Sequence, residues 1–279
     1  MTRQVTASCL ALTLALGSVA CQGGAAPAAP AASTAEAPAA PASGKMSVLA
    51  PANLKRARPA APFDLTGNWF IDTSESAEAW RFGPPYPKLT KEAQVHFDRS
   101  AALAKEGKVY KDDIAQCYPA GLPLIMTRYW PMAMIQLPTS VYMVSGFMNS
   151  LRIVYLDGRE HTPPDEAINT ANGESIGRWE GDTLVVDSKY FVDDRHWMDQ
   201  GGRSIPAGDQ LHIVERIRLL KDVDKLEIAY TMTDPENWEG EWKSTKRFVR
   251  VVDEDISEVV CTPDLNEHLK STSSKAYVK

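Results

Sequence analysis

The sequence predicts an all-β fold, namely an antiparallel up-and-down β-barrel with one helix outside it. From residue 133 onward, short segments alternate apolar and polar residues with a period of two, and turn-forming residues separate them. We count roughly nine or ten such segments. None is followed by a helical stretch long enough to connect parallel strands, and closure of such a meander removes its exposed edges. A two-sheet β-sandwich is the alternative.

The segment 175–188, with the sequence SIGRWEGDTLVVDS, predicts a tight hairpin. We expect Glu180 and Gly181 to form its two-residue turn, because glycine readily adopts the positive φ that such turns require. Leu184 and Val186 then share one face of the second strand, and Asp187 lies on the opposite face.

A second hairpin is expected at Asp157-Gly158, a dipeptide that favours tight turns between antiparallel strands. One helix is expected over 91–106, because Thr90 can cap its start and Gly107 can end it. The other expected strands are 134–137, 141–147, 151–156, 210–219, 225–233, 241–252 and 256–261.

The first twenty residues have the pattern of a secretory signal peptide, with Arg3 near the start and an apolar run over 10–16. The apolar run is too short for a permanent transmembrane helix. Two processing routes stay open. One is cleavage after Ala20, and the other is lipidation of Cys21, which would attach the protein to a membrane. Either route predicts an exported protein of the periplasm or cell envelope.

The rest of the chain divides into two parts. Residues 21–62 are rich in Ala and Pro and are expected to form a disordered tether, whereas 63–279 suit a single barrel domain. The net charge is −6, and no basic stripe with interleaved aromatic residues occurs, which argues against nucleic acid as a partner. No phosphate-binding loop or dinucleotide fingerprint occurs, so we expect no cofactor.

The four cysteines divide between the leader and the domain. Cys9 and Cys21 belong to the leader, and Cys117 and Cys261 remain in the domain. Two distant cysteines in an exported domain predict a disulfide between Cys117 and Cys261, which would close a long loop.

Several motifs in this order resemble a large family of exported bacterial barrel proteins without an assigned general function. They are 152–159 (RIVYLDGR), 175–187 (SIGRWEGDTLVVD), 211–216 (LHIVER) and 259–261 (VVC), and the resemblance covers 117–261. Gly67 and Trp69 are similar to the first strand of lipocalin-like barrels. The resemblance implies export, a barrel and the cysteine pair rather than a reaction. Glu174 stands where relatives often carry histidine.

Glu215 is the most informative polar residue. The alternation over 210–219 places it on the face of Ile213 and Ile217, so a carboxylate interrupts an apolar stripe. Burial would raise the pKa of Glu215 and suit it to general acid or base chemistry. The alternative is a structural ion pair with an arginine such as Arg178.

Three function classes stay open. The one that we favour is a binding barrel for a small apolar or aromatic molecule. The second is a cofactor-free isomerase, cyclase, dehydratase or lyase, in which Glu215 works with His212 or His161 while Arg178 or Arg216 stabilises negative charge. A weaker third is a zinc hydrolase using His161, His196 and His212, but no short metal-ligand spacing supports a metal. Candidate ligand-binding residues are Glu174, Asp187, Trp197 and Arg216.

Overall fold

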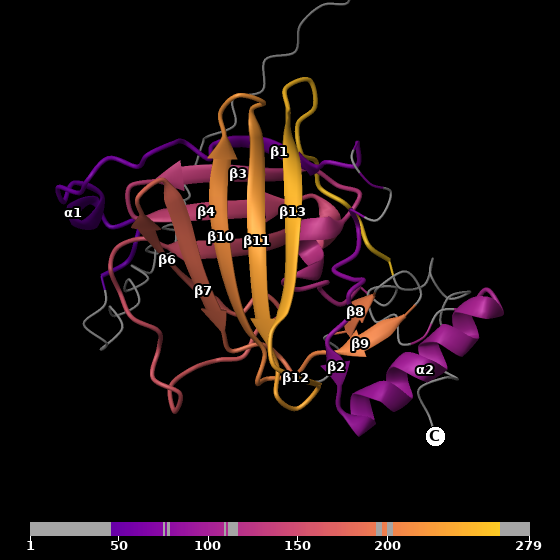
Figure 1. Cartoon of the computed structure of the whole chain (residues 1–279). Coiled ribbons are helices and arrows are strands. Elements are labelled where there is room, and N and C mark those ends of the chain that lie inside the picture. The colour runs from indigo at the N-terminus through magenta and orange to yellow at the C-terminus, as the bar shows by residue number, and fades with distance from the viewer. Residues whose placement is uncertain are drawn as a thin grey trace, which may run out of the picture. The chain divides into compact units, whose positions relative to one another are not determined.

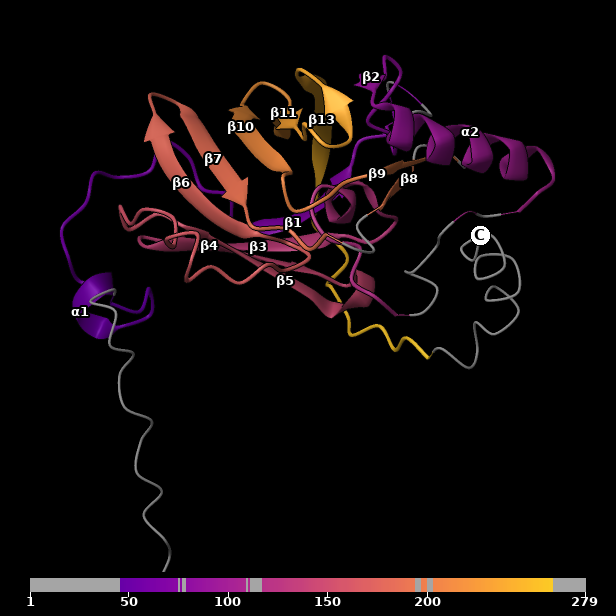
Figure 2. The same ribbon diagram turned by 90° about the horizontal axis from the view of Figure 1, so that it is seen from below.

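The computed structural model describes residues 46–74, 76, 79–108, 110, 117–193, 197–199 and 203–262. Nine strands form a closed barrel, which confirms the predicted all-β barrel (Figure 1). In Figure 2, β6, β7, β10, β11 and β13 lie on one side of the barrel, and β1, β3, β4 and β5 lie on the other. The barrel strands are β1 (Gly67–Ile71), β3 (Met132–Leu137), β4 (Ser140–Ser145), β5 (Ser150–Tyr155), β6 (Glu174–Glu180), β7 (Thr183–Lys189), β10 (His212–Leu220), β11 (Lys225–Thr233) and β13 (Trp242–Val251).

Successive barrel strands are neighbours, and β1 closes the ring between β13 and β3. Neighbouring strands are antiparallel except β5 and β6, which are parallel. Strand direction cannot alternate without interruption around a ring of nine, so one parallel pair is unavoidable. The barrel is therefore up-and-down with a single exception.

The parallel pair corrects the prediction of a hairpin at Asp157-Gly158. Gly158 does adopt a positive φ of 83°, but the turn leads into a long connection over 156–173 rather than directly into an antiparallel strand. This connection must carry the chain back along the barrel before β6 begins, because parallel neighbours start at the same end. It thereby brings His161 to the outer side of the β6–β7 hairpin.

The β6–β7 hairpin forms as predicted, with a shift of one residue at its turn. Glu180 pairs with Thr183, so Gly181 and Asp182 form the turn, and Gly181 has a φ of 61°. Leu184 and Val186 are fully buried, as the alternation predicts.

The barrel interior is filled by large side chains. Trp69 is buried, donates from Nε1 to the carbonyl of Leu65 at 2.8 Å, and is covered by the guanidinium of Arg250. Other fully buried members of this core include Met134, Met143, Leu184, Tyr230, Trp242 and Phe248. Such close packing of apolar side chains provides most of the stability of the barrel.

The predicted helix is present as α2 (Lys91–Lys105), and the side chain of Thr90 accepts a hydrogen bond from the backbone of Ala93. It lies outside the barrel and packs against β9 (Ser204–Pro206), which pairs with β8 (Trp197–Asp199) (Figure 1). A further small sheet joins β2 (Lys88–Leu89) to β12 (Trp238–Glu239).

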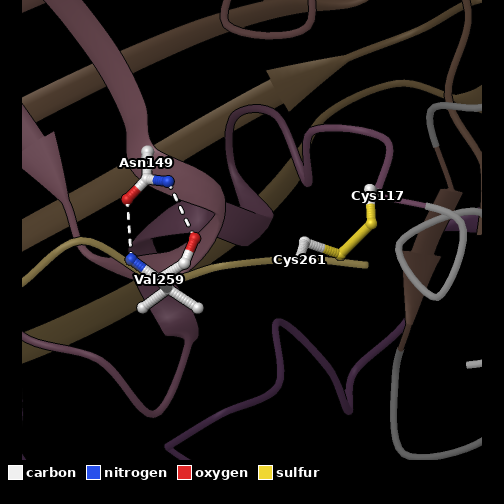
Figure 3. Close-up of a disulfide and its surroundings, with 4 residues drawn as sticks. All are labelled: Cys117, Asn149, Val259 and Cys261. Atoms are coloured by element: carbon white, nitrogen blue, oxygen red, sulfur yellow. Dashed lines mark hydrogen bonds between the residues drawn. A yellow bond between two sulfur atoms is a disulfide. The ribbon is translucent and has the colours of Figure 1, made fainter. Parts of the chain in front are cut away.

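The predicted strand over 256–261 does not form. These residues instead run as an extended segment that Asn149 holds through two hydrogen bonds to the backbone of Val259 (Figure 3). Asn149 ends the short 3-10 helix η3 (Phe147–Asn149), and a second one, η2 (Leu124–Thr127), lies earlier in the chain. The predicted disulfide joins Cys117 to Cys261, with the Cα atoms 5.7 Å apart.

Residues 46–62, at the end of the segment for which the sequence predicts a tether, lie against the barrel. They contain the short helix α1 (Pro51–Leu54). Asn53 is buried and donates a hydrogen bond to Asp157, and the carbonyl of Val48 accepts one from Thr139. We call residues 46–62 the N-terminal arm. Cys21 and the remainder of the leader and tether lie outside the described residues.

Candidate functional site

The barrel interior contains an ion pair between Arg152 of β5 and Glu215 of β10. Both side chains are almost completely buried. The two guanidinium nitrogens Nη1 and Nη2 each bond one carboxylate oxygen, and Arg152 also donates to the hydroxyls of Ser175 and Ser188, each at 3.1 Å. A bidentate pair of this kind satisfies the charges that burial would otherwise make very costly.

This arrangement decides between the two predictions for Glu215. The residue faces the interior, as predicted, and it forms the structural ion pair, with Arg152 rather than Arg178. It does not meet His212, because residues three apart on a strand point to opposite faces. The predicted acid–base pair of Glu215 with a histidine is therefore not assembled.

Four of the other predicted site residues come together on the outside of the barrel. They are His161 from the 156–173 connection, Glu174 from β6, Asp187 from β7 and His212 from β10, and we call them the outer-wall cluster. Their side chains are between 17% and 35% exposed, so the cluster is half-buried and reachable from solvent.

Asp187 is the centre of the cluster. Its Oδ1 lies 2.8 Å from Nε2 of His161, and its Oδ2 lies 2.9 Å from Nε2 of His212. Burial alone would raise the pKa of Asp187, but the hydrogen bonds from the two histidines outweigh burial and leave this pKa well below its usual range. Asp187 is consequently a carboxylate that accepts from both imidazoles.

His161 lies between two carboxylates. Its Nδ1 is 2.9 Å from Oε2 of Glu174, and its Nε2 faces Asp187. An ionised carboxylate only accepts hydrogen bonds, so both ring nitrogens of His161 must carry protons. The hydrogen bond to Asp187 raises the pKa of His161, and together with the bond to Glu174 it outweighs the opposing effect of burial. His161 is therefore held as an imidazolium.

Glu174 is fixed by the residue that follows His161. The backbone N–H of Thr162 donates to Oε2 at 2.8 Å, and the Thr162 hydroxyl donates to Oε1 at 2.7 Å. Burial would raise the pKa of Glu174, but these bonds and the one from His161 lower it overall. Tyr190 covers another side of His161. Its ring makes an edge contact with the His161 ring, and its hydroxyl donates a hydrogen bond to the carbonyl of Thr162. The backbone of Tyr190 is left-handed, with a φ of 65°.

The remaining predicted site residues lie elsewhere. Arg178 and Arg216 both bind Glu180 on the exposed wall, at 2.8 and 3.0 Å, and neither joins the cluster. Trp197 belongs to β8, but its side chain lies outside the described part of the chain, as does His196. Within the described residues, no group of three or more His, Cys, Asp or Glu side chains is arranged to hold a metal ion.

A groove of about 920 Å³ opens at the end of the barrel that carries the β3–β4 and β6–β7 turns, beneath the N-terminal arm. We call it the end groove. Trp179 forms part of its wall, and the ring of Phe63 makes an edge contact with the Trp179 ring at 5.0 Å. Its other linings include Arg58, Pro62, Leu137, Leu156 and Arg178.

No protein-family model matches this chain, and no curated protein matches it significantly. The resemblance to exported bacterial barrel proteins stays a prediction. Among the helices of the described ranges, none has the length and apolar character needed to cross a bilayer. The function must therefore be argued from the geometry of the end groove and the outer-wall cluster.

Three residues of the inner pair and the outer-wall cluster's surroundings were not predicted from the sequence, namely Arg152, Thr162 and Tyr190. Arg152 carries a readable signal, because in the alternating segment 151–156 it shares a face with Val154, as Glu215 shares one with Ile213. Two opposite charges that each interrupt an apolar stripe predict an internal ion pair. Thr162 and Tyr190 carry no such signal, because Thr162 lies on the long 156–173 connection and Tyr190, directly after β7, contacts residues of that connection.

Proposed function

We propose that the protein is an exported binding protein that holds a small molecule with an aromatic or apolar body and an anionic group in the end groove. The volume of about 920 Å³ lies within the range of small-molecule pockets. This groove, walled by an indole and flanked by arginines, is the observation that carries the proposal.

The apolar part of the ligand would contact Trp179, Leu137 and Leu156. Trp179 is half-buried, so one part of its ring is fixed against Phe63 while another part borders the groove. An aromatic ligand gains about 0.5–1.5 kcal/mol from such a ring contact beyond the burial of its area.

Two arginines beside the end groove can bind the anionic group of the ligand. Arg58 donates from Nη1 to the carbonyls of Asn53 and Arg56 and from Nη2 to the Asn53 side chain. Within the described part of the chain, the other N–H groups of its five have no acceptor. Arg178 is exposed at the groove, and its one ion-pair partner among the described residues is the solvent-accessible Glu180. A carboxylate or sulfonate could exchange with such an exposed partner at small cost.

The binding test compares two dyes that share a similar aromatic body. 8-Anilinonaphthalene-1-sulfonate carries a sulfonate, whereas N-phenyl-1-naphthylamine lacks it. We expect Trp179→Ala to weaken the binding of both dyes about tenfold. Arg178→Gln should weaken only the sulfonate dye, as measured by fluorescence titration.

Arg216→Gln is the matched control, because Arg216 pairs with the same Glu180 but does not line the groove. Equal loss of sulfonate binding in Arg216→Gln and Arg178→Gln would contradict the assignment of the groove. Unchanged dye binding in Trp179→Ala would overturn the proposal. Mass spectrometry of the purified protein under native conditions should then identify a ligand of the proposed chemistry.

A further inference from the structure

We propose that the outer-wall cluster is a second, separate site, in which His212 acts as a general base that removes a proton from a carbon acid next to a carbonyl group. This site shares no residue with the end groove. Its chemistry belongs to the enzyme class that the sequence leaves open, but it lies on the outer wall and not in the barrel interior.

The tautomer of His212 follows from its partner. Asp187 is ionised and only accepts, so Nε2 of His212 carries the proton that forms their 2.9 Å hydrogen bond. When His212 is neutral, its lone pair is therefore on Nδ1. A carboxylate that orients an imidazole in this way is the usual support of a histidine base.

Nδ1 of His212 is available to a substrate. Among the residues that the structure describes, it has no hydrogen-bond partner. The His212 side chain is 35% exposed, the most accessible of the four cluster members. His161 cannot do the same work, because both of its nitrogens donate to carboxylates.

Lys189 supplies a positive charge beside this base. Its Nζ lies 3.8 Å from Oδ1 of Asp187, so His212 and Lys189 approach the two oxygens of one carboxylate. The Lys189 side chain is 43% exposed, and no described residue accepts a hydrogen bond from its Nζ, so its donors remain for a substrate oxygen. A base and a cation held on one carboxylate suit a reaction in which negative charge develops near the position of deprotonation.

The assigned step balances without a further reactant. Nδ1 of His212 takes the proton from the C–H bond, the electrons of that bond form the carbon–carbon double bond of an enolate, and the negative charge moves to the carbonyl oxygen beside Lys189. His212 then returns the proton to another atom of the product, so the net reaction is an isomerisation. Asp187 is a positioning residue, because it acts through His212.

The test uses 5-nitrobenzisoxazole as a carbon-acid probe. Removal of its C3 proton breaks the ring N–O bond and releases a coloured nitrophenolate, so neither a cofactor nor a second reactant is required. We expect the protein to exceed the buffer rate, His212→Gln to lower the protein-dependent rate at least tenfold, and Lys189→Met to lower it severalfold. His96→Gln, a change to a histidine of α2 outside the cluster, should leave the rate unchanged.

A His212→Gln rate equal to that of the unaltered protein would overturn the proposal. A second measurement on the unaltered protein remains decisive even where a variant fails to fold. Diethyl pyrocarbonate acylates only an unprotonated ring nitrogen, so peptide mapping should show rapid modification of His212 and protection of His161. Rapid modification of His161, or protection of His212 at alkaline pH, would equally contradict the assignment.

Discussion

The two serines that bind the inner ion pair and two carboxylates of the outer-wall cluster are adjacent residues of the same strands. On β6, Glu174 points outward and Ser175 inward, and on β7 the same holds for Asp187 and Ser188. The strand period of two therefore divides one polar motif into two sites. What separates their roles is the environment on each side of the wall.

Inside the barrel, the side chains of Arg152 and Glu215 are at most 3% exposed, and each neutralises the charge of the other. Outside, the cluster has partial access to water, and Nδ1 of His212 has no hydrogen-bond partner among the described residues. Buried charges that are fully paired specify packing, whereas half-buried charges with spare hydrogen-bonding capacity can bind or exchange protons. The comparison predicts that mutations inside affect stability most, and mutations outside affect chemistry most.

The largest effect is expected from Glu215→Gln, which leaves the buried Arg152 without a counter-charge. We expect a loss of about 3–5 kcal/mol in the free energy of unfolding, measured by urea denaturation. The double variant Arg152→Met with Glu215→Leu should recover most of that loss, since replacing both charges by apolar groups is often neutral. A double variant as unstable as Glu215→Gln would show that the pair is more than a structural element.

A smaller loss is expected from Asp187→Asn. This change removes the charge that accepts from His161 and His212, but water can partly replace it because the Asp187 side chain is 26% exposed. We expect the free energy of unfolding to fall by about 1–3 kcal/mol, measured by the same urea denaturation. A loss as large as that of Glu215→Gln would contradict the distinction between the two sides of the wall.

The ion pairs of the outer-wall cluster should make the stability of the protein depend on pH. The pKa of His161 is raised from 6.5 by folding, so its stabilising contribution is complete below pH 6.5 and is lost as the pH rises through the folded value. The pKa values of Glu174 and Asp187 are lowered, so their contributions are present above about pH 4.5 and are lost as the pH falls through the folded values. The stability difference between the unaltered protein and His161→Gln should be largest between about pH 4.5 and 6.5.

Denaturation of both proteins between pH 4 and 9 measures this difference. A difference that grows steadily above pH 6.5 would have the wrong sign for an imidazolium held between carboxylates.

The smallest effect on stability is expected from a change at Glu180, on the exposed outer wall of the barrel. Glu180 pairs with Arg178 and Arg216 but lies in water, where such pairs contribute little. Glu180→Gln should leave the denaturation midpoint without a measurable shift in moderate salt. A clear shift would show that charge pairs on the outer wall stabilise the fold more than their exposure suggests.

Much of the fold could be predicted from the sequence, because alternation in 210–219 and 225–233 is a direct consequence of a two-sided wall. Alternation in 210–219 placed Glu215 on the apolar face, and alternation in the hairpin segment 175–188 placed Asp187 on the face opposite Leu184. The parallel β5–β6 pair could not be predicted from Asp157-Gly158, since a local turn preference does not determine which strand the chain joins next.

The outer-wall cluster could be predicted only in part, because local sequence patterns do not determine the path of a long connection. His161, Glu174, Asp187 and His212 were candidates separately, but their meeting depends on the path of the 156–173 connection around the barrel. The N-terminal arm shows the reverse case. An Ala- and Pro-rich composition predicts a tether, yet the buried Asn53 and its bond to Asp157 hold residues 46–62 at the end groove.

Nitrogen-15 NMR of the histidine side chains, recorded as a function of pH, reports directly which ring nitrogens carry protons. We expect His161 to keep protons on both ring nitrogens above pH 6.5, and neutral His212 to carry its proton on Nε2 with Nδ1 unprotonated. Asp187→Asn should disturb both signals, whereas Glu215→Gln, if folded, should leave them in place. A neutral His161 at pH 6.5, or a neutral His212 protonated on Nδ1, would contradict the account.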